Sequence, residues 1–206
     1  MRILVVTAVA VERDAVAGSG LTAIAGGVGP ARAAASTAVA LAGGAYDAVL
    51  SAGIAGGFAD VVAPGATVVG TTSIAADLGA ETPDGFLTLD DLGFGSSTVE
   101  CDAALVGWLC TALPAAVAGP VLSVSTVTGT AARAATLRTR YPDAVAEGME
   151  GFGVAVAAAA AGIPFAELRT ISNPIGPRDR AAWRIPDALA ALAAAATALA
   201  ADLARG

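Results

Sequence analysis

The sequence predicts a single three-layer α/β domain that spans residues 1–206. Apolar runs of strand length alternate with alanine-rich helical patterns from one end of the chain to the other. Short glycine-rich turns join them, as in α/β folds whose helices cover a sheet. A chain of 206 residues is long enough for one such domain with a sizeable core and too short for two ordinary ones.

The N-terminal half begins with a continuous apolar run at 3–8, typical of a strand that is covered on both faces. A second short run leads into Gly26–Pro30, where proline opens a helix that ends at Gly43 and Gly44. Further strands are expected at 47–52, which runs into Gly53–Gly57, and at 67–72. Residues 77–100 are acidic with scattered glycines, and they predict a long surface excursion.

The C-terminal half continues the alternation without an internal repeat or a linker. A helix at 102–113 stops before Pro114, and a strand at 121–127 leads through Thr128–Thr130 into a short helix. A helix that begins at Met149 and Glu150 precedes a strand at 165–173. The expected elements end with an irregular segment and a last helix at 186–203.

Composition excludes several classes of function. Hydrophobic residues make up 56% of the chain and charged residues 14%, so part of the surface is expected to be buried against another subunit. The richest apolar run, 154–161, is far shorter than the roughly twenty residues that cross a bilayer. The N-terminus lacks the basic region of a signal peptide. We therefore expect a cytoplasmic protein with no membrane partner.

Charge and residue counts narrow the chemistry. A net charge of −7 with only 11 Lys and Arg argues against nucleic acid as a partner. The absence of histidine excludes Ser-His-Asp and Cys-His triads and most zinc chemistry. Cys101 and Cys110 have no histidine or third cysteine to join them in a metal site, and a disulfide is not expected. We expect no cofactor and no metal, with acid–base work left to carboxylates.

Three polar residues stand where a site is expected, and each has two interpretations. Glu12 follows the first strand, where an acid usually offsets the helix dipole. Glu150 also lies at a helix start, but its neighbours are apolar, and burying an unpaired carboxylate there is costly. Asn173 ends a strand, at the edge where α/β sheets bind ligands, or it forms a turn before Pro174.

Two glycine-rich turns are also ambiguous. Gly27–Pro30 begins like a dinucleotide-binding fingerprint but lacks its third glycine, which favours a tight strand–helix turn. Gly53–Gly57 is either a similar turn or a bare surface where backbone N–H groups let a ligand approach closely.

Taken together, segments along nearly the whole chain resemble the nucleoside phosphorylase and nucleosidase superfamily, in its purine nucleosidase branch. The matched segments are 3–12, 26–35, 51–57, 123–130, 147–151 and 169–173, and the last two are the most specific. The resemblance implies a mixed, twisted sheet with flanking helices, a small-molecule nucleoside substrate and usually a homodimer.

The resemblance also implies roles for individual residues. Glu12 would activate the attacking water, and Met149 with Glu150 would hold the ribose hydroxyls. Asn173 would address N7 and the C6 substituent of the purine. The remaining substrate-binding residues implied by the matched segments are Ser172 beside Asn173, Thr126 and Val127 in the base pocket, and Ile54, which replaces a small hydroxyl residue of relatives.

Two departures from the superfamily pattern define the expected reaction. Phosphorylases usually carry an arginine just before the glycine-rich strand end, whereas Ser51-Ala52-Gly53 has no cation, so water is the expected nucleophile. Adenine-specific relatives tend to have aspartate at the position of Asn173. An amide can donate to O6 of a 6-oxo purine, which would repel a carboxylate. We therefore expect hydrolysis of a 6-oxo purine nucleoside with hypoxanthine or guanine as the leaving base, and the resemblance implies hypoxanthine.

Other functions remain open at this stage. The alternatives are a methylthioadenosine/S-adenosylhomocysteine nucleosidase, a purine nucleoside phosphorylase and a non-catalytic nucleoside-binding protein. Arg178, Arg180 and Arg184 beside Trp183 form either a solvated basic loop or a cation site for an acidic group on the 5′ side of the substrate.

Overall fold

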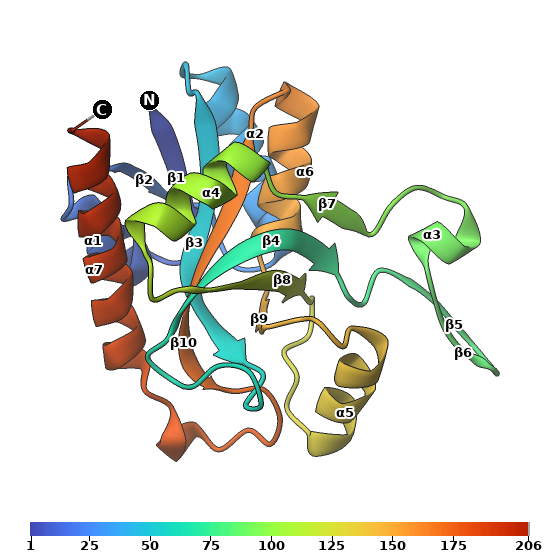
Figure 1. The fold of residues 1–206 in the computed structure, drawn as a ribbon. Coiled ribbons are helices and arrows are strands. Elements are labelled where there is room, and N and C mark those ends of the chain that lie inside the picture. Colours follow the sequence, from blue (N-terminus) through green and yellow to red (C-terminus); the bar gives the residue numbers. More distant parts are fainter. Residues whose placement is uncertain (206) are drawn as a thin grey trace.

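A mixed sheet with helices on both faces forms the core of the computed structural model, which describes residues 1–205 (Figure 1). The sheet strands are β1 (Ile3–Thr7), β2 (Thr22–Ala25), β3 (Ala48–Gly57), β4 (Thr67–Ala75), β7 (Thr98–Glu100), β8 (Val117–Ser123), β9 (Ala146–Gly148) and β10 (Phe165–Pro174). The helices are α1 (Ala10–Ala17), α2 (Pro30–Ala42), α3 (Leu89–Leu92), α4 (Ala103–Ala112), α5 (Ala131–Arg140), α6 (Gly151–Ala161) and α7 (Ile185–Leu203). This architecture confirms the predicted fold class.

The sheet partly closes on itself. Its strand order is β10-β4-β8-β9-β3-β1-β2, and β10 pairs with β3 as well as with β4. Five strands therefore form a ring, from which β1 and β2 extend beside β3. The pairing of β10 is parallel to β3 and antiparallel to β4, which makes the sheet mixed. Periodicity does not reveal this closure, because it depends on which strands pair rather than on their sequence.

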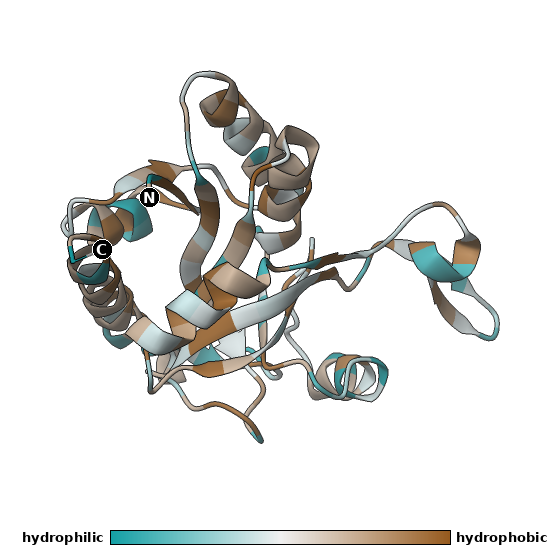
Figure 2. Ribbon diagram, turned by 45° about the horizontal axis from the view of Figure 1, so that its top comes forward, coloured by the Kyte–Doolittle hydropathy of each residue, from teal (hydrophilic) through white to brown (hydrophobic). Residues whose placement is uncertain are grey.

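Separate apolar clusters cover the two faces of the sheet. One face packs against α1, α4 and α7, and the other packs against α2 and α6. Figure 2 shows hydrophobic central strands, with the hydrophilic residues mainly on helix surfaces and around α3. Helices thus cover both faces of the sheet.

The last helix, α7, is long and apolar enough to cross a membrane by length and composition alone. The expectation that no segment meets those criteria was therefore wrong. The helix instead packs its inner face against the sheet, where Leu192 and Leu199 are buried in the same cluster as Leu50 and Leu168. The buried residues of this helix are thus part of the domain core.

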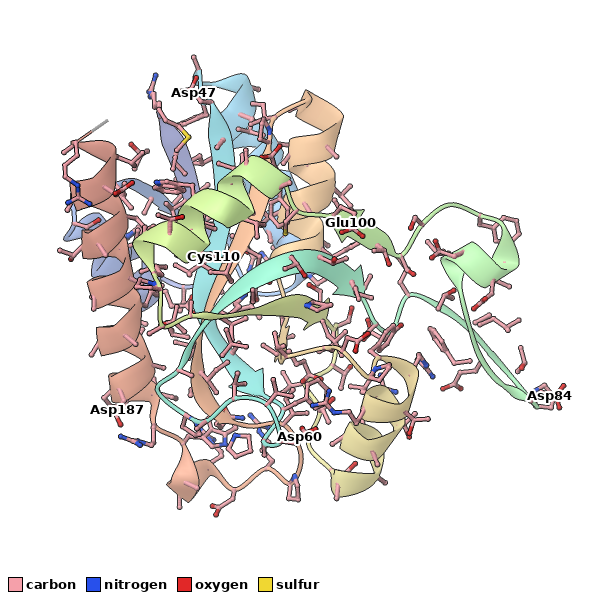
Figure 3. All side chains as sticks on the ribbon, viewed as in Figure 1. Asp47, Asp60, Asp84, Glu100, Cys110 and Asp187 are labelled. Carbon is pink, nitrogen blue, oxygen red and sulfur yellow. The ribbon has the colours of Figure 1, made fainter. Side chains whose placement is uncertain are left out.

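The acidic excursion has structure of its own. A two-stranded hairpin, β5 (Gly79–Thr82) and β6 (Gly85–Thr88), extends away from the domain with α3, and Asp84 lies at its tip (Figures 1 and 3). Asp90 links α3 to the segment that leads back to the sheet, because it accepts hydrogen bonds from Ser96 and Ser97. These bonds lower the pKa of Asp90 to about 2. The excursion thus confirms the surface prediction.

Two element boundaries differ from the prediction. The strand expected at 121–127 lies at Val117–Ser123, because the chain leaves the sheet where the Ser125 N–H donates to Asp77. The helix expected from Met149 begins at Gly151, after the short strand β9, which had not been predicted. Three-residue strands carry too little sequence to show a period.

Candidate active site

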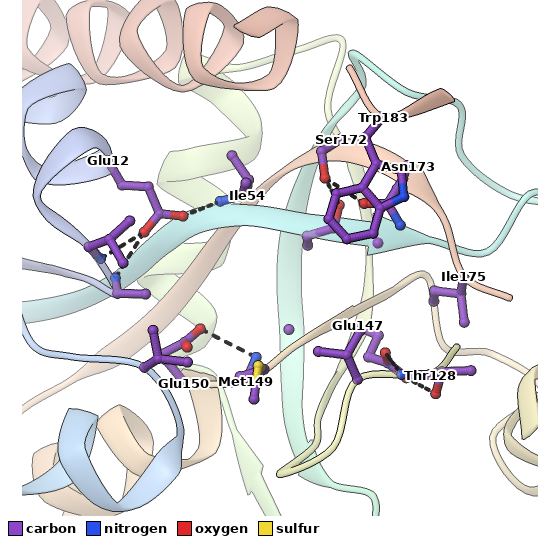
Figure 4. A pocket seen from close by; sticks show the side chains of 17 residues that line it. Glu12, Ile54, Thr128, Glu147, Met149, Glu150, Ser172, Asn173, Ile175 and Trp183 are labelled. Carbon is purple, nitrogen blue, oxygen red and sulfur yellow. Dashed lines mark hydrogen bonds between the residues drawn. The ribbon is translucent and has the colours of Figure 1, made fainter. Parts of the chain in front are cut away.

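A pocket opens at the carboxyl ends of β1, β3, β9 and β10, as expected for an α/β sheet (Figure 4). Its volume is about 250 Å³. Three carboxylates line it, from Glu12, Glu147 and Glu150. Within residues 1–205, none of the residues that line the pocket is a lysine or an arginine.

The carboxylate of Glu12 is fixed by backbone donors. One oxygen, Oε2, accepts from the N–H groups of Ala8 and Val9 at 3.0 and 3.1 Å, and Oε1 accepts from the Ile54 N–H at 2.9 Å. The residue is 3% exposed and still lines the pocket. Glu12 therefore caps α1, as its usual role suggested, and also presents a buried acceptor to a ligand.

Glu150 is held by polar partners, contrary to the apolar setting that its sequence neighbours indicated. Its Oε1 accepts from the Gly29 N–H at 3.1 Å and its Oε2 from the Met149 N–H at 3.3 Å. Gly27 and Gly29 adopt positive φ angles of 95° and 89°, which confirms the tight-turn interpretation of this segment. The turn aims a backbone N–H at the carboxylate.

A buried cation that the sequence did not indicate lies beneath the pocket. Arg169 on β10 is 1% exposed; its Nη2 donates to Ser51 at 2.9 Å, and its Nε donates to Glu167 at 2.8 Å. Its Nη1 lies 3.8 Å from Glu150. Burial opposes the charged form, but the carboxylates of Glu167 and Glu150 outweigh it and raise the pKa of Arg169.

The prediction of no cation near Ser51 is therefore wrong, because Arg169 contacts Ser51 in the folded chain. The parallel pairing of β10 with β3 sets Arg169 directly beside Gly53, which no local motif could show. The pocket itself keeps the expected character, since Arg169 is not among the residues that line it. Its guanidinium is enclosed and paired, unlike a phosphate clamp open to the ligand.

The glycines of β3 make room for this buried cluster. The segment Gly53–Gly57 is part of the strand and not a turn after it. A Cβ added to Gly53 would lie 2.8 Å from Glu12 Oε1 and 3.1 Å from Arg169 Nη1. The bare surface expected for a ligand is thus covered at Gly53 by the protein's own charged groups.

A β-bulge brings two neighbouring side chains to the pocket. The register between β10 and β3 shifts between Ile171 and Asn173, so Ser172 is an extra residue in its strand. Both Ser172 and Asn173 line the pocket, although successive residues of a regular strand point to opposite faces. The Ser172 hydroxyl donates to Asn173 Oδ1 at 2.7 Å, and Asn173 Nδ2 donates to the Pro174 carbonyl at 2.9 Å. Both ends of the amide are thereby oriented.

Of the two residues predicted for the base pocket, the structure places one at this pocket. Val127 lines the pocket, whereas Thr126 is exposed and lies outside it. The pocket residue is Thr128, which is buried and donates through its N–H and its hydroxyl to Glu147. The chain leaves β8 earlier than expected, which shifts the inward-facing positions.

The remaining predicted residues also line this pocket. Met149 and Ile54 line the pocket at the end that holds Glu12 and Glu150, and Ser172 and Asn173 lie toward the other end (Figure 4). Trp183 also lines the pocket, but it was not among the predicted substrate residues. One end of the pocket thus carries Glu12 and Glu150. The other end carries the oriented amide of Asn173 and the ring of Trp183.

Comparisons with known proteins define the class. The chain resembles the S-adenosylhomocysteine nucleosidase of Streptococcus pyogenes, with a TM-score of 0.86 and 19% identity over 98% of this chain and 97% of that one. It also resembles the 5′-methylthioadenosine/S-adenosylhomocysteine nucleosidase of Streptococcus pneumoniae, with a TM-score of 0.84 and 17% identity over 98% and 100% of the two chains. At such identity these structures share the fold. Residues 10–205 match the model of the phosphorylase superfamily, so the chain belongs to that superfamily.

More similar relatives name the family. The chain is 56% identical to the futalosine hydrolase of Streptomyces coelicolor, over 93% of this chain and 92% of that protein. It is 48% identical to the futalosine hydrolase of Acidothermus cellulolyticus, over 95% and 89% of the two chains. Within the superfamily, the chain belongs to the futalosine hydrolase family.

Proposed function

We propose that this enzyme hydrolyses the N-glycosidic bond of futalosine, releasing hypoxanthine and dehypoxanthine futalosine in the futalosine pathway of menaquinone biosynthesis. The relatives named futalosine hydrolase support this substrate. The observation that carries the proposal is the pocket itself, which joins buried carboxylates at one end to an oriented amide at the other, with no cation on its wall within residues 1–205.

The proposed mechanism is dissociative. Glu150 holds the 2′- and 3′-hydroxyls of the ribose while positive charge develops on the sugar ring, and this interaction strengthens in the transition state. Glu12 orients a water and accepts its proton as the water attacks C1′. Asn173 stabilises the departing hypoxanthine by donating to O6 and by accepting from N7–H once N7 has taken a proton from solvent, and Glu12 afterwards returns the water's proton to solvent. The fixed backbone donors around Glu12 and Glu150 hold both acids in place before the substrate arrives.

One experiment tests the substrate and the nucleophile together. Futalosine, inosine and methylthioadenosine are incubated with the enzyme, with and without phosphate, and the released bases are separated by chromatography. We expect hypoxanthine from futalosine at the same rate in both buffers. Release that requires phosphate would identify a phosphorylase instead, and binding without release of any base would identify a nucleoside-binding protein.

We expect Asn173→Asp to lower the preference for futalosine over its 6-amino analogue by at least about tenfold. A carboxylate at this position accepts from a 6-amino group but leaves O6 without a donor, and a mispaired buried polar group costs about 1–3 kcal/mol. Competition kinetics with the two nucleosides give the ratio of kcat/KM values directly. Ser172→Ala is the matched control, because it removes the bond that orients the amide and keeps the amide itself. An unchanged ratio in Asn173→Asp would mean that the base is read elsewhere.

The proposed substrate carries an aromatic carboxylate on its 5′ side, and a cation is needed to bind it. The arginines near Trp183 are the candidates for this contact. The guanidinium carbons of Arg178 and Arg180 lie 5.5 and 5.8 Å from the centre of the Trp183 ring, which lines the pocket. Arg184 is paired with Asp187 at 2.5 Å. Of the three candidates from the sequence, we propose Arg178 and Arg180 as the cations for this carboxylate.

Replacing both Arg178 and Arg180 by alanine is expected to raise the KM for futalosine about three- to tenfold with little change in kcat. Exposed ion pairs contribute about 0.2–1 kcal/mol each, and the two contacts are lost together. Arg184→Ala is the control and should leave KM unchanged. Any inosine cleavage should be unaffected, since inosine lacks the carboxylate. An equal rise for both nucleosides would contradict this assignment.

We also propose a homodimer that forms through the face made by α2 and α6. These neighbouring helices expose Val39 and Val156, and Phe94 on the excursion is 80% exposed, which is unusual for a large apolar side chain. Light scattering is expected to show a dimer, and Val39→Glu is expected to shift it toward the monomer. A monomeric wild-type protein at micromolar concentration would contradict this proposal.

A further inference from the structure

A third carboxylate in the pocket has no part in the mechanism above. Glu147 lies on β9 opposite Gly56 of β3, and Figure 4 shows it with Thr128 across the pocket from Asn173. The residue is 5% exposed. Its Oε1 accepts from the Thr128 N–H at 2.9 Å, and its Oε2 accepts from the Thr128 hydroxyl at 2.5 Å. Glu147 is therefore a positioned acceptor at the base end of the pocket.

The carboxylate has acceptor capacity left over. Each oxygen can accept two hydrogen bonds and receives one from Thr128. Among residues 1–205, no lysine or arginine nitrogen lies within 4.0 Å of it. Burial raises the pKa of Glu147 despite the two bonds from Thr128. A buried carboxylate with spare acceptor positions and no cation beside it is stabilised by a further hydrogen-bond donor from a ligand.

We infer that Glu147 accepts a hydrogen bond from N1–H of a 6-oxo purine and so sets base specificity together with Asn173. This inference rests on the proposed function. N7, O6 and N1 follow one another along one edge of the purine, so two side chains at the same end of the pocket can divide that edge between them. A 6-amino purine has an unprotonated N1, which would face the carboxylate as a second acceptor. Glu147 thus favours the oxo base and disfavours the amino base at the same contact.

A purely structural role makes a different prediction. Glu147 also ties the segment that contains Thr128 to β9, and losing this tie would lower activity on all nucleosides alike. The decisive quantity is the preference for the oxo base over the amino base, and not the activity itself.

Glu147→Gln separates the two roles. The Thr128 N–H needs an acceptor, so the glutamine oxygen takes the place of Oε1, and its NH₂ group takes the place of Oε2 and donates to the Thr128 hydroxyl. The tie is kept, but one of the two acceptor atoms of the side chain becomes a donor. Thr128→Val is the matched control, because it removes the hydroxyl contact and leaves both the N–H and the carboxylate.

The test measures kcat/KM for futalosine and for its 6-amino analogue in the wild-type enzyme and both variants. In Glu147→Gln the preference for futalosine is expected to fall about ten- to a hundredfold, the size of one hydrogen bond to a charged group. Thr128→Val is expected to keep the wild-type preference within about threefold. An unchanged preference in Glu147→Gln, or equal losses on both nucleosides, would overturn the inference.

Binding of free bases by calorimetry tests Glu147 independently of futalosine turnover. The wild-type protein is expected to bind hypoxanthine at least about tenfold more tightly than 1-methylhypoxanthine, which lacks the N1–H donor. Equal affinities would overturn the inference even if Glu147→Gln failed to fold. Failure to release hypoxanthine from futalosine would overturn the proposed function instead, and it would leave the base-binding result to decide the role of Glu147.

Discussion

Glu12→Gln is expected to bind futalosine and to lower kcat by about 10²–10⁴-fold, the usual contribution of a general base. Glutamine keeps the size of the side chain but cannot accept the proton of the attacking water. It also has one acceptor oxygen in place of two. Either the Ile54 N–H or the N–H groups of Ala8 and Val9 would then face an NH₂ group. Single-turnover kinetics and equilibrium binding of futalosine separate the chemical step from affinity.

In Glu12→Gln, the loss of a helix cap has to be distinguished from the loss of the proposed general base. Breaking these contacts costs about 1–3 kcal/mol and lowers the melting temperature without removing the pocket. Asp14→Asn is the matched control, because Asp14 lies on the same helix and pairs only with the exposed Arg13. It should turn over normally. Turnover of Glu12→Gln near the wild-type rate would show that another group activates the water.

Arg169→Met is expected to destabilise the folded enzyme by about 3–5 kcal/mol, because it leaves a buried carboxylate without its partner. Glu167 is completely buried and depends on Arg169 for its salt bridge at 2.8 Å, and Glu150 lies near the same guanidinium. Urea unfolding measures the loss. Arg32→Met makes the same chemical change at an exposed site and should shift the free energy of unfolding by no more than about 0.5 kcal/mol.

The pH dependence of that loss tests its electrostatic origin. Burial raises the pKa of Glu167, and Arg169 is the main group that opposes this effect. Without Arg169, the folded variant binds a proton at Glu167 that the unfolded chain releases near neutral pH. Its stability therefore falls as pH rises, and the difference from wild type is smaller at pH 5 than at pH 8. A pH-independent difference would point to lost packing around the side chain instead.

The elements that could be predicted are those with a long, regular signal. The strand at 3–8 is almost wholly a buried apolar run, and the helix from Pro30 has both a proline start and a glycine end. The strand β9 has three residues, and the closure of the ring depends on β10 pairing on both sides. Such pairings are set by the packing of the whole domain, so no single segment shows them.

The same contrast explains which site residues were missed. Glu12, Glu150 and Asn173 lie next to recognisable turns, so their neighbours along the chain indicated their place. Arg169 lies inside a strand, away from any turn, and its partners Ser51 and Glu150 are far away along the chain. Glu147 was visible as an acid close to Glu150, but only the fold shows that its side chain faces the pocket and not solvent.

The bulge at Ser172 also bears on how specificity can evolve in this fold. Residues 167–170 of β10 are paired on both sides, by β3 and by β4, and they carry Arg169. Asn173 lies beyond the bulge, where the pairing with β4 has ended and only β3 remains. If Asn173 reads the base as proposed, mutations at 173 are expected to change base preference while the doubly paired segment keeps the ionic cluster intact. One strand thus combines a segment that is paired on both sides with a segment that is paired on one side only.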